Sequence, residues 1–214
     1  MRIAFLGVKG SGKGTYASRL SPILKIPHIS TGDIFREIIA KETPLGKKVK
    51  EIVNKGKFVS DDIVLEILKE RLKNSDCKNG FILDGVPRTV EQAKGLEKLE
   101  KLDIVICLDV PEDIIVKRIS SRITCKKCGE IYNLLNMKPE REGICDKCGG
   151  KLYQRKDDTP ESARQRLKED EENLKPLIEY YKEKGILRIV SCNEFNSPPE
   201  DTVNKILEIL GDLK

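Results

Sequence analysis

The residues from Gly7 to Lys13 have the pattern of a phosphate-binding loop. They read Gly-Val-Lys-Gly-Ser-Gly-Lys, which fits G-x-x-x-x-G-K, and they follow an apolar run at 2–6. Glycines at this spacing allow a tight turn whose backbone N–H groups bind phosphate oxygens, and Lys13 adds a point charge. A glycine-rich surface turn is the alternative, but the strand before the loop and the helix-forming residues after it disfavour that interpretation. We therefore expect a nucleoside triphosphate to bind at Gly10, Ser11, Gly12, Lys13, Gly14 and Thr15.

Asp84 is a candidate for holding magnesium. It ends the apolar run of GFILDGVPRT, where ligands of open parallel sheets bind, and a carboxylate there can hold Mg²⁺ through water. The alternative is an Asp-Gly turn at a strand end, which is common. Asp33, in STGD, is a weaker candidate because it could equally start a helix.

Arginines recur near the predicted loops, whereas the chain has a single histidine, His28, in a weak strand. Converging guanidinium groups would neutralise the charge of a transferring phosphoryl group, although any one arginine could be a solvated surface charge. A histidine general base is not expected, and a phosphate acceptor needs no base. The candidate arginines are Arg36, Arg88, Arg122, Arg155 and Arg166.

Four of the seven cysteines form two C-x2-C-G turns, at Cys125/Cys128 and Cys145/Cys148. This pairing predicts a closed, tetrahedral zinc site that stabilises a small lobe, with two disulfides or a redox pair as the alternatives. The acidic residues among the lysines of this lobe disfavour nucleic-acid binding. We expect the remaining three, Cys77, Cys107 and Cys192, to be buried and inert.

The composition is that of a globular protein. Charged residues make up 35% and hydrophobic residues 38%, and the longest apolar runs are strand-sized, which argues against disorder and against a membrane span. The first glycine follows the N-terminus too closely for a signal peptide, so we expect a cytoplasmic protein. A formal net charge of +5 spread along the chain fits small anionic ligands better than nucleic acid.

Strands and helices that would position these residues alternate along the chain. Continuous apolar runs separated by helical periods predict an α/β fold with a doubly wound parallel sheet. The predicted strands lie at 2–6, 26–29, 80–83, 103–110 and 187–191. A helix is expected after Ser60, and Pro111 and Pro160 are expected as first helical residues. Two insertions interrupt the alternation: two short helices within 31–59, separated at Thr43-Pro44 and ended by Gly56, and the cysteine segment 123–154.

The ordered set of motifs resembles the adenylate kinase family, a nucleoside monophosphate kinase family, in its long form with a zinc-bearing lid. The motifs are GVKGSGKGT, STGDIFR, GKFVSDD, GFILDGVPRT with Gln92, VPEDIIVKRISSR, the four cysteines and YQRKDDTPESARQRL, and they span essentially the whole chain. The resemblance implies reversible, Mg²⁺-dependent transfer of a phosphoryl group from ATP to AMP, giving two ADP. It also implies a five-stranded P-loop core at 1–29, 60–121 and 157–214, a helical AMP-binding insert at 30–59 and a β lid at 122–156.

The resemblance also assigns residues to roles. The catalytic group would be Lys13, Asp84, Arg88, Arg122, Arg155 and Arg166. ATP would contact the loop together with Arg118, Arg122 and Tyr132. AMP would contact Thr31, Arg36, Lys57, Phe58, Val59, Gly85, Val86, Arg88, Gln92, Arg155 and Arg166. The lid zinc would be held by Cys125, Cys128, Cys145 and Cys148, and Mg²⁺ by Asp84 through water.

Three departures from the family pattern stand out, none of which removes a charge or a phosphate donor. Val8-Lys9 replaces the usual Ala-Pro, Tyr16 a usual Gln, and Val86 a usual Phe. Thr31 in STGD favours AMP over the pyrimidine nucleotides of the related UMP/CMP kinases. We expect a monomeric cytoplasmic adenylate kinase that binds neither nucleic acid nor membrane. The alternatives are a UMP/CMP kinase and a nucleotide-gated zinc ribbon that binds nucleic acid.

Overall fold

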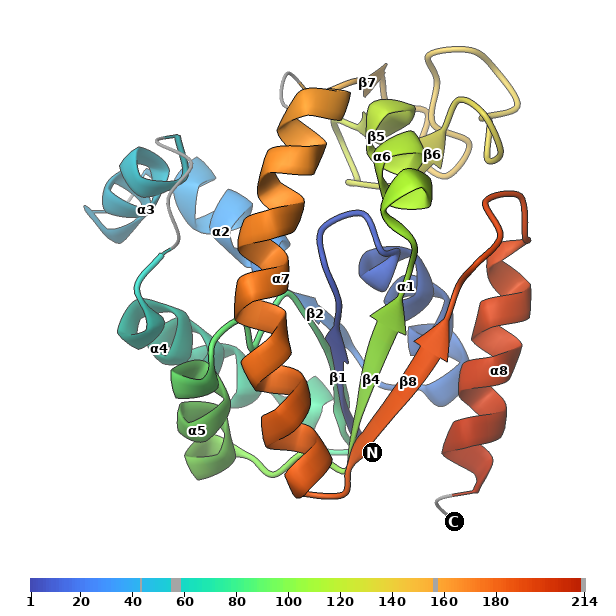
Figure 1. The fold of residues 1–214 in the computed structure, drawn as a ribbon. Coiled ribbons are helices and arrows are strands. Elements are labelled where there is room, and N and C mark those ends of the chain that lie inside the picture. Colours follow the sequence, from blue (N-terminus) through green and yellow to red (C-terminus); the bar gives the residue numbers. More distant parts are fainter. Residues whose placement is uncertain (43, 55–58, 156–157, 213–214) are drawn as a thin grey trace.

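A five-stranded parallel sheet forms the centre of the computed structural model, which describes residues 1–42, 44–54, 59–155 and 158–212 without the side chains of residues 53, 54, 166 and 169 (Figure 1). Its strand order is β2-β3-β1-β4-β8. The strands are β1 (Arg2–Leu6), β2 (His28–Ser30), β3 (Phe81–Asp84), β4 (Ile104–Asp109) and β8 (Leu187–Ser191). Ile3 of β1 lies opposite Ile82 on one side and Ile104 on the other. The predicted doubly wound α/β fold is confirmed.

Helices cover both faces of this sheet because its strands are apolar on both faces. Ala4 and Leu6 point to one face, whereas Ile3 and Phe5 point to the other. The first face packs against α4 (Asp61–Leu72), α5 (Val90–Leu99) and α7 (Pro160–Glu183), and the second against α1 (Lys13–Leu24) and α8 (Pro199–Gly211). Each fully buried large side chain of this kind contributes about 1.5–3 kcal/mol to folding.

Two insertions flank the carboxyl ends of the strands (Figure 1). The first is the helix pair α2 (Thr31–Ala40) and α3 (Pro44–Asn54), as predicted. The second is an antiparallel sheet in the order β6-β5-β7. Its strands are β5 (Arg122–Cys125), β6 (Ile131–Asn133) and β7 (Leu152–Tyr153), and they follow α6 (Glu112–Ser120). A short 3-10 helix, η1 (Ser75–Cys77), precedes β3.

The predicted helix starts agree with the structure at two of three positions. Helix α4 begins at Asp61 after Ser60. Helix α7 begins at Pro160, and the Thr159 side chain accepts a hydrogen bond from the Ser162 N–H at 3.2 Å. The prediction for Pro111 is wrong by one residue, because its ψ of 144° is extended and the helix begins at Glu112. Gly56, the predicted end of the second insert helix, lies outside the described residues.

The three cysteines outside the paired turns are buried, as predicted. Cys77, Cys107 and Cys192 are at most 6% exposed. Burial raises the pKa of the Cys107 thiol to about 11, so this thiol stays protonated and unreactive at neutral pH. Among the described helices, none has the length and apolarity needed to cross a membrane.

Candidate functional site

The glycine-rich loop connects the end of β1 to the start of α1. Gly12 precedes the helix with φ +101°, and a Cβ atom there would lie 2.8 Å from the Tyr16 ring. A side chain at this position would be both strained and obstructed. The Lys13 ammonium donates hydrogen bonds to the carbonyl oxygens of Gly7 at 2.7 Å and Val8 at 3.0 Å. The charge of Lys13 therefore lies at the glycine-rich turn, where phosphate is expected to bind.

The charges of Asp84 and Lys13 influence each other at this site. Burial lowers the pKa of Lys13, and the negative charge of Asp84 opposes that shift. Burial also works against ionisation of Asp84, but neighbouring His28, Lys13 and Arg88 outweigh it and lower the pKa of this carboxyl group below its ordinary value. Asp84 is therefore ionised at neutral pH, which suits a group that would hold Mg²⁺ through water.

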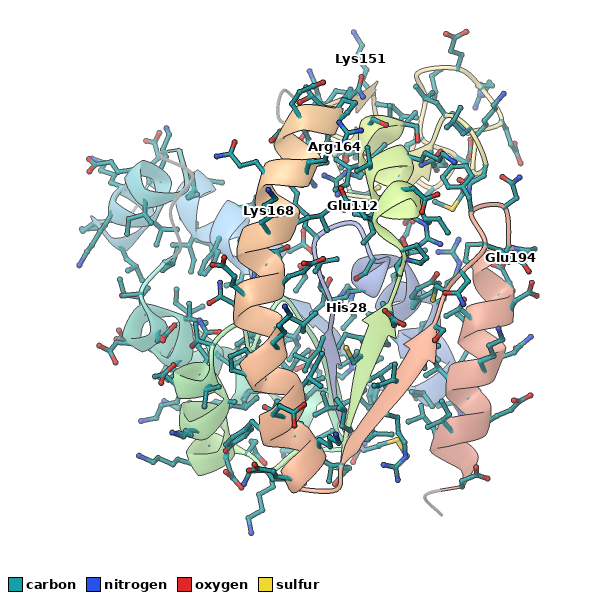
Figure 2. The ribbon with its side chains drawn as sticks, viewed as in Figure 1. His28, Glu112, Lys151, Arg164, Lys168 and Glu194 are labelled. Carbon is teal, nitrogen blue, oxygen red and sulfur yellow. The ribbon has the colours of Figure 1, made fainter. Side chains whose placement is uncertain are left out.

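His28 lies beside that carboxylate, in the interior of the molecule (Figure 2). Its Nε2 atom is 3.4 Å from Asp84 Oδ2, without the alignment of a hydrogen bond. The sequence predicted a structural histidine, and its neighbour in the structure is the candidate magnesium ligand. The parallel register places His28 of β2 opposite Ile82 of β3 and Ser30 opposite Asp84, so the His28 side chain reaches the carboxylate diagonally.

Arginines from separate elements converge on the same region. The pKa of Arg155 is lowered, first by burial and then by the positive charges of Arg122 and Arg36. Arg122 donates hydrogen bonds through two guanidinium nitrogens to the carboxylate of Asp158, which is 3% exposed. Arg118 donates to the Ser11 carbonyl oxygen at 3.2 Å. The cations repel one another, so the region attracts an anion such as a polyphosphate.

A cavity of about 980 Å³ joins these groups. It is lined by the core, by α2 of the insert and by the lid. The predicted site residues along it are Gly10, Gly12, Lys13, Gly14, Thr15, Thr31, Arg36, Val59, Asp84, Gly85, Arg88, Gln92, Arg118, Arg122, Tyr132 and Arg155. Ser11 and Val86 do not line the cavity, because both residues are 0% exposed, and the Ser11 N–H donates to the Val8 carbonyl oxygen at 3.2 Å. Lys57, Phe58 and the Arg166 side chain lie outside what the structure describes.

Sequence reasoning missed three acidic residues that accept hydrogen bonds around the site. Asp158 pairs with Arg122, Asp61 accepts a hydrogen bond from Gln92, and Asp170 accepts one from the loop at the Lys9 N–H. Each partner is far from its target in the sequence. The one available signal was position, because Asp158 precedes the N-cap of α7 and Asp61 begins α4.

The four paired cysteines form one cluster in the lid. All four Sγ atoms lie within 4.8 Å of one another. The Cys125–Cys148 and Cys128–Cys145 Sγ pairs are 3.5 and 3.6 Å apart, too far for disulfides, whose S–S bond is about 2.05 Å. Four thiolates bound to Zn²⁺ at about 2.3 Å would have S···S separations of about 3.8 Å, so the spacing fits a tetrahedral metal.

At Cys145, local hydrogen bonds favour the thiolate form that a metal requires. Burial opposes ionisation of Cys145, but the Tyr132 hydroxyl and the backbone N–H groups of Cys148 and Lys147 lower the pKa of its thiol to about 6. Tyr132 also accepts a hydrogen bond from the Asp146 N–H at 2.9 Å. Tyr132 therefore lines the cavity while its hydroxyl contacts the cysteine cluster.

Comparison with known proteins identifies the family. The family model described as adenylate kinase matches residues 5–186. The chain is 48% identical over 216 residues to the adenylate kinase of Caldicellulosiruptor bescii, covering 99% of each chain. It is 53% identical to that of Thermosipho africanus, covering 89% of this chain and 92% of the relative, and 51% identical to that of Archaeoglobus fulgidus, covering 87% and 88%. This chain belongs to the adenylate kinase family.

Proposed function

We propose that this protein catalyses reversible transfer of the terminal phosphoryl group of ATP to AMP, giving two ADP. The convergence of Arg36, Arg122 and Arg155 on one cavity, with Lys13 at its base, is the observation that carries the proposal. A reaction between two phosphate anions needs concentrated positive charge, and it needs no group to take up a proton. The names of the relatives, all adenylate kinases, agree with this activity.

The two nucleotides occupy opposite ends of the cavity in this proposal. ATP binds with its phosphates on the loop from Gly10 to Thr15, with Arg118, Arg122 and Tyr132 around it. AMP binds between the insert and the core, at residues that include Thr31, Arg36, Arg88 and Gln92. Its further contacts are Lys57, Phe58, Val59, Gly85, Val86, Arg155 and Arg166. Lys13, Arg88, Arg122, Arg155 and Arg166 then surround the phosphoryl group in transit.

The side chains promote the reaction by position and charge. As the phosphoryl group leaves ATP, negative charge spreads over its oxygens, and guanidinium groups already fixed in place stabilise that charge without rearrangement. The Asp158 carboxylate orients the Arg122 guanidinium. Magnesium, when bound, would supply further neutralisation of the phosphates, and Asp84 would hold it through water.

The lid and the insert act as mobile lobes over the core. Residues 1–29, 60–121 and 157–214 form the core, 30–59 the AMP-binding insert and 122–156 the lid. Closure of the two lobes excludes water, which would otherwise accept the phosphoryl group. Zinc at the four cysteines holds the small lid together, since about thirty residues bury too little surface to be stable alone. The enzyme acts as a monomer in the cytoplasm, where its seven cysteines remain reduced.

The test is an acceptor comparison with the purified protein. Mg-ATP is mixed with AMP, CMP or UMP, and ADP formation is followed. The proposal expects two ADP per AMP consumed and little transfer to the pyrimidine nucleotides. Preferential transfer to CMP or UMP would indicate a pyrimidine nucleotide kinase. Slow ATP turnover that needs no acceptor, together with salt-sensitive binding to DNA or RNA, would support a nucleic-acid-binding zinc protein.

A further inference from the structure

Gln92 belongs to a closed ring of hydrogen bonds at the AMP end of the cavity. Its side-chain Nε2 donates to Asp61 Oδ1 at 2.7 Å. Its backbone N–H donates to the Thr89 hydroxyl at 3.0 Å, and that hydroxyl donates to Asp61 Oδ2 at 2.9 Å. Both the backbone and the side chain of Gln92 are thus held by one carboxylate, which stands at the start of α4, a different helix.

The chemistry of these partners fixes the orientation of the Gln92 amide. Its Oε1 accepts from the Arg88 backbone N–H at 2.7 Å, and that group can only donate. Its Nε2 faces the Asp61 carboxylate, which when ionised can only accept. If the amide were flipped, its oxygen would face the Asp61 carboxylate and its NH2 group would face the Arg88 backbone N–H, and neither contact could be a hydrogen bond. Because Gln92 is 4% exposed, a flipped amide would leave both unfavourable contacts buried, so one orientation is strongly preferred.

We propose that Asp61 is a positioning residue that sets the base selectivity of the monophosphate site through Gln92. This inference rests on the proposed function, in which Gln92 meets the base of AMP. Oε1 and Nε2 of Gln92 each have one hydrogen-bond partner already. Oε1 therefore keeps one lone pair, and Nε2 keeps one N–H, for a ligand. Their places are fixed by Asp61 and Arg88, and a base must present matching acceptor and donor atoms.

Adenine and hypoxanthine differ in their hydrogen-bond donors and acceptors at the edge formed by position 6 and N1. Adenine offers an amino donor at N6 and an acceptor at N1, whereas the hypoxanthine of IMP offers an acceptor at O6 and a donor at N1. The two bases have nearly the same shape and opposite polarity. A locked amide therefore accepts AMP and rejects IMP, because a mismatched base would leave buried polar groups unpaired. An amide free to flip would serve both.

The experiment compares Asp61→Ala with Asp62→Ala. Both residues are acidic and lie in the first turn of α4, so both variants lose the same charge at the same helix terminus. Asp62 is exposed. The readout is the ratio of kcat/KM for AMP to kcat/KM for IMP, with Mg-ATP saturating. We expect Asp61→Ala to lower this ratio at least about tenfold through a higher KM for AMP, with KM for ATP unchanged. Asp62→Ala should leave the ratio within about twofold of the wild type.

An unchanged ratio in folded Asp61→Ala would overturn the inference, as would equal shifts in the two variants, since the second outcome reports only helix-terminus charge. If Asp61→Ala does not fold, Asp61→Asn is measured instead. Its amide can either donate or accept, so it should also lower the AMP/IMP ratio, and an unchanged ratio there again overturns the inference. Wild-type protein that forms no ADP from AMP would refute the proposed function itself, and it is assayed first.

Discussion

Arg155 shows how a single residue can cost stability and serve catalysis. Its positive charge is half-buried and lies near those of Arg122 and Arg36, which lowers its pKa and makes the charged form less stable than that of an exposed arginine. Asp158 and Tyr153 offset part of this cost, and an anion bound among the arginines would offset more. We therefore expect Arg155→Ala to lower kcat by about a thousandfold, the smaller end of what removal of a transition-state arginine costs.

The same substitution should leave thermal stability unchanged or raise it, because it removes like-charge repulsion. Arg164→Ala is the matched control, since Arg164 is an exposed arginine on α7 (Figure 2). Steady-state kinetics and thermal melts of both variants test the prediction. A large fall in melting temperature for Arg155→Ala, with kcat little changed, would make this arginine a structural residue.

Asp84 predicts a pH effect with a definite sign. Its folded-state pKa is lowered by His28, Lys13 and Arg88, so the ionised form contributes stability above the ordinary carboxyl pKa of about 4. That contribution is lost as the pH falls below this value. Asp84→Asn lacks it at every pH, so its melting temperature should be lower than that of the wild type at pH 7, with a difference that narrows toward pH 3.

Asp109→Asn serves as the control for Asp84→Asn, since Asp109 ends the strand β4 of the same sheet and is exposed. Its melting temperature should follow that of the wild type across the whole pH range. Melts at half-unit pH intervals suffice. A difference between Asp84→Asn and the wild type that widens in acid would contradict the assigned direction of the shift.

At the scale of elements, sequence patterns were sufficient where a local rule determines the result. The apolar runs gave the five strands, Thr159-Pro160 gave the start of α7, and the C-x2-C-G spacing gave the cysteine cluster. Pro111 was misplaced because proline suits both an extended N-cap and a first helical residue. The acidic partners Asp61 and Asp158 could not be foreseen, since their pairing depends on the tertiary approach of separate elements.

The contact between the phosphate loop and α7 accounts for one departure from the family pattern. The Lys9 backbone N–H donates to Asp170 Oδ2 at 2.6 Å, a bond that the usual proline could not form. We expect Lys9→Pro to destabilise the protein by about 1.5–3 kcal/mol, the usual range for a hydrogen bond to a charged group. Lys9→Ala removes the side chain but keeps the N–H, so urea unfolding of the two variants isolates this bond. Equal stability of Lys9→Pro and Lys9→Ala would show that the bond contributes nothing.

The cysteine cluster should matter more for the stability of the lid than for the chemistry. We expect removal of the metal by a chelator, or Cys145→Ser, to cost about 3 kcal/mol, which corresponds to about 6–12 °C in melting temperature at this chain length. The value of kcat at low temperature should change less. Cys77→Ser, outside the cluster, should retain one metal per chain by elemental analysis. Parallel loss of kcat and melting temperature on metal removal would refute a purely structural role.

At the scale of the whole molecule, three parts of the chain meet around one cavity. The core supplies the loop and Asp84, whereas Arg36 comes from the insert and Tyr132 from the lid. The sheet places the first two at its carboxyl edge, as in other open parallel sheets. The order of the motifs along the chain suggested these parts, but not the contacts that hold the lid on the core.

Asn136 makes one of the contacts between the lid and the core, and we expect this contact to control lid closure. Its side-chain amide donates to the Phe195 carbonyl oxygen, which ties the lid to the segment before α8. Asn136→Ala should weaken closure by about one hydrogen bond, or about 1 kcal/mol, and so raise KM for ATP about fivefold. Where lid opening limits turnover, kcat should stay the same or rise.

Lys138→Ala, at an exposed lid position nearby, should leave KM for ATP and kcat unchanged. Steady-state kinetics with AMP saturating gives KM and kcat, and ATP hydrolysis without AMP reports water entry. If the lid closes less tightly in Asn136→Ala, ATP hydrolysis should increase relative to phosphoryl transfer to AMP. If KM for ATP and hydrolysis both match the wild type, the contact does not control closure, and the seal must come from elsewhere, such as the Arg19 contact with Met137.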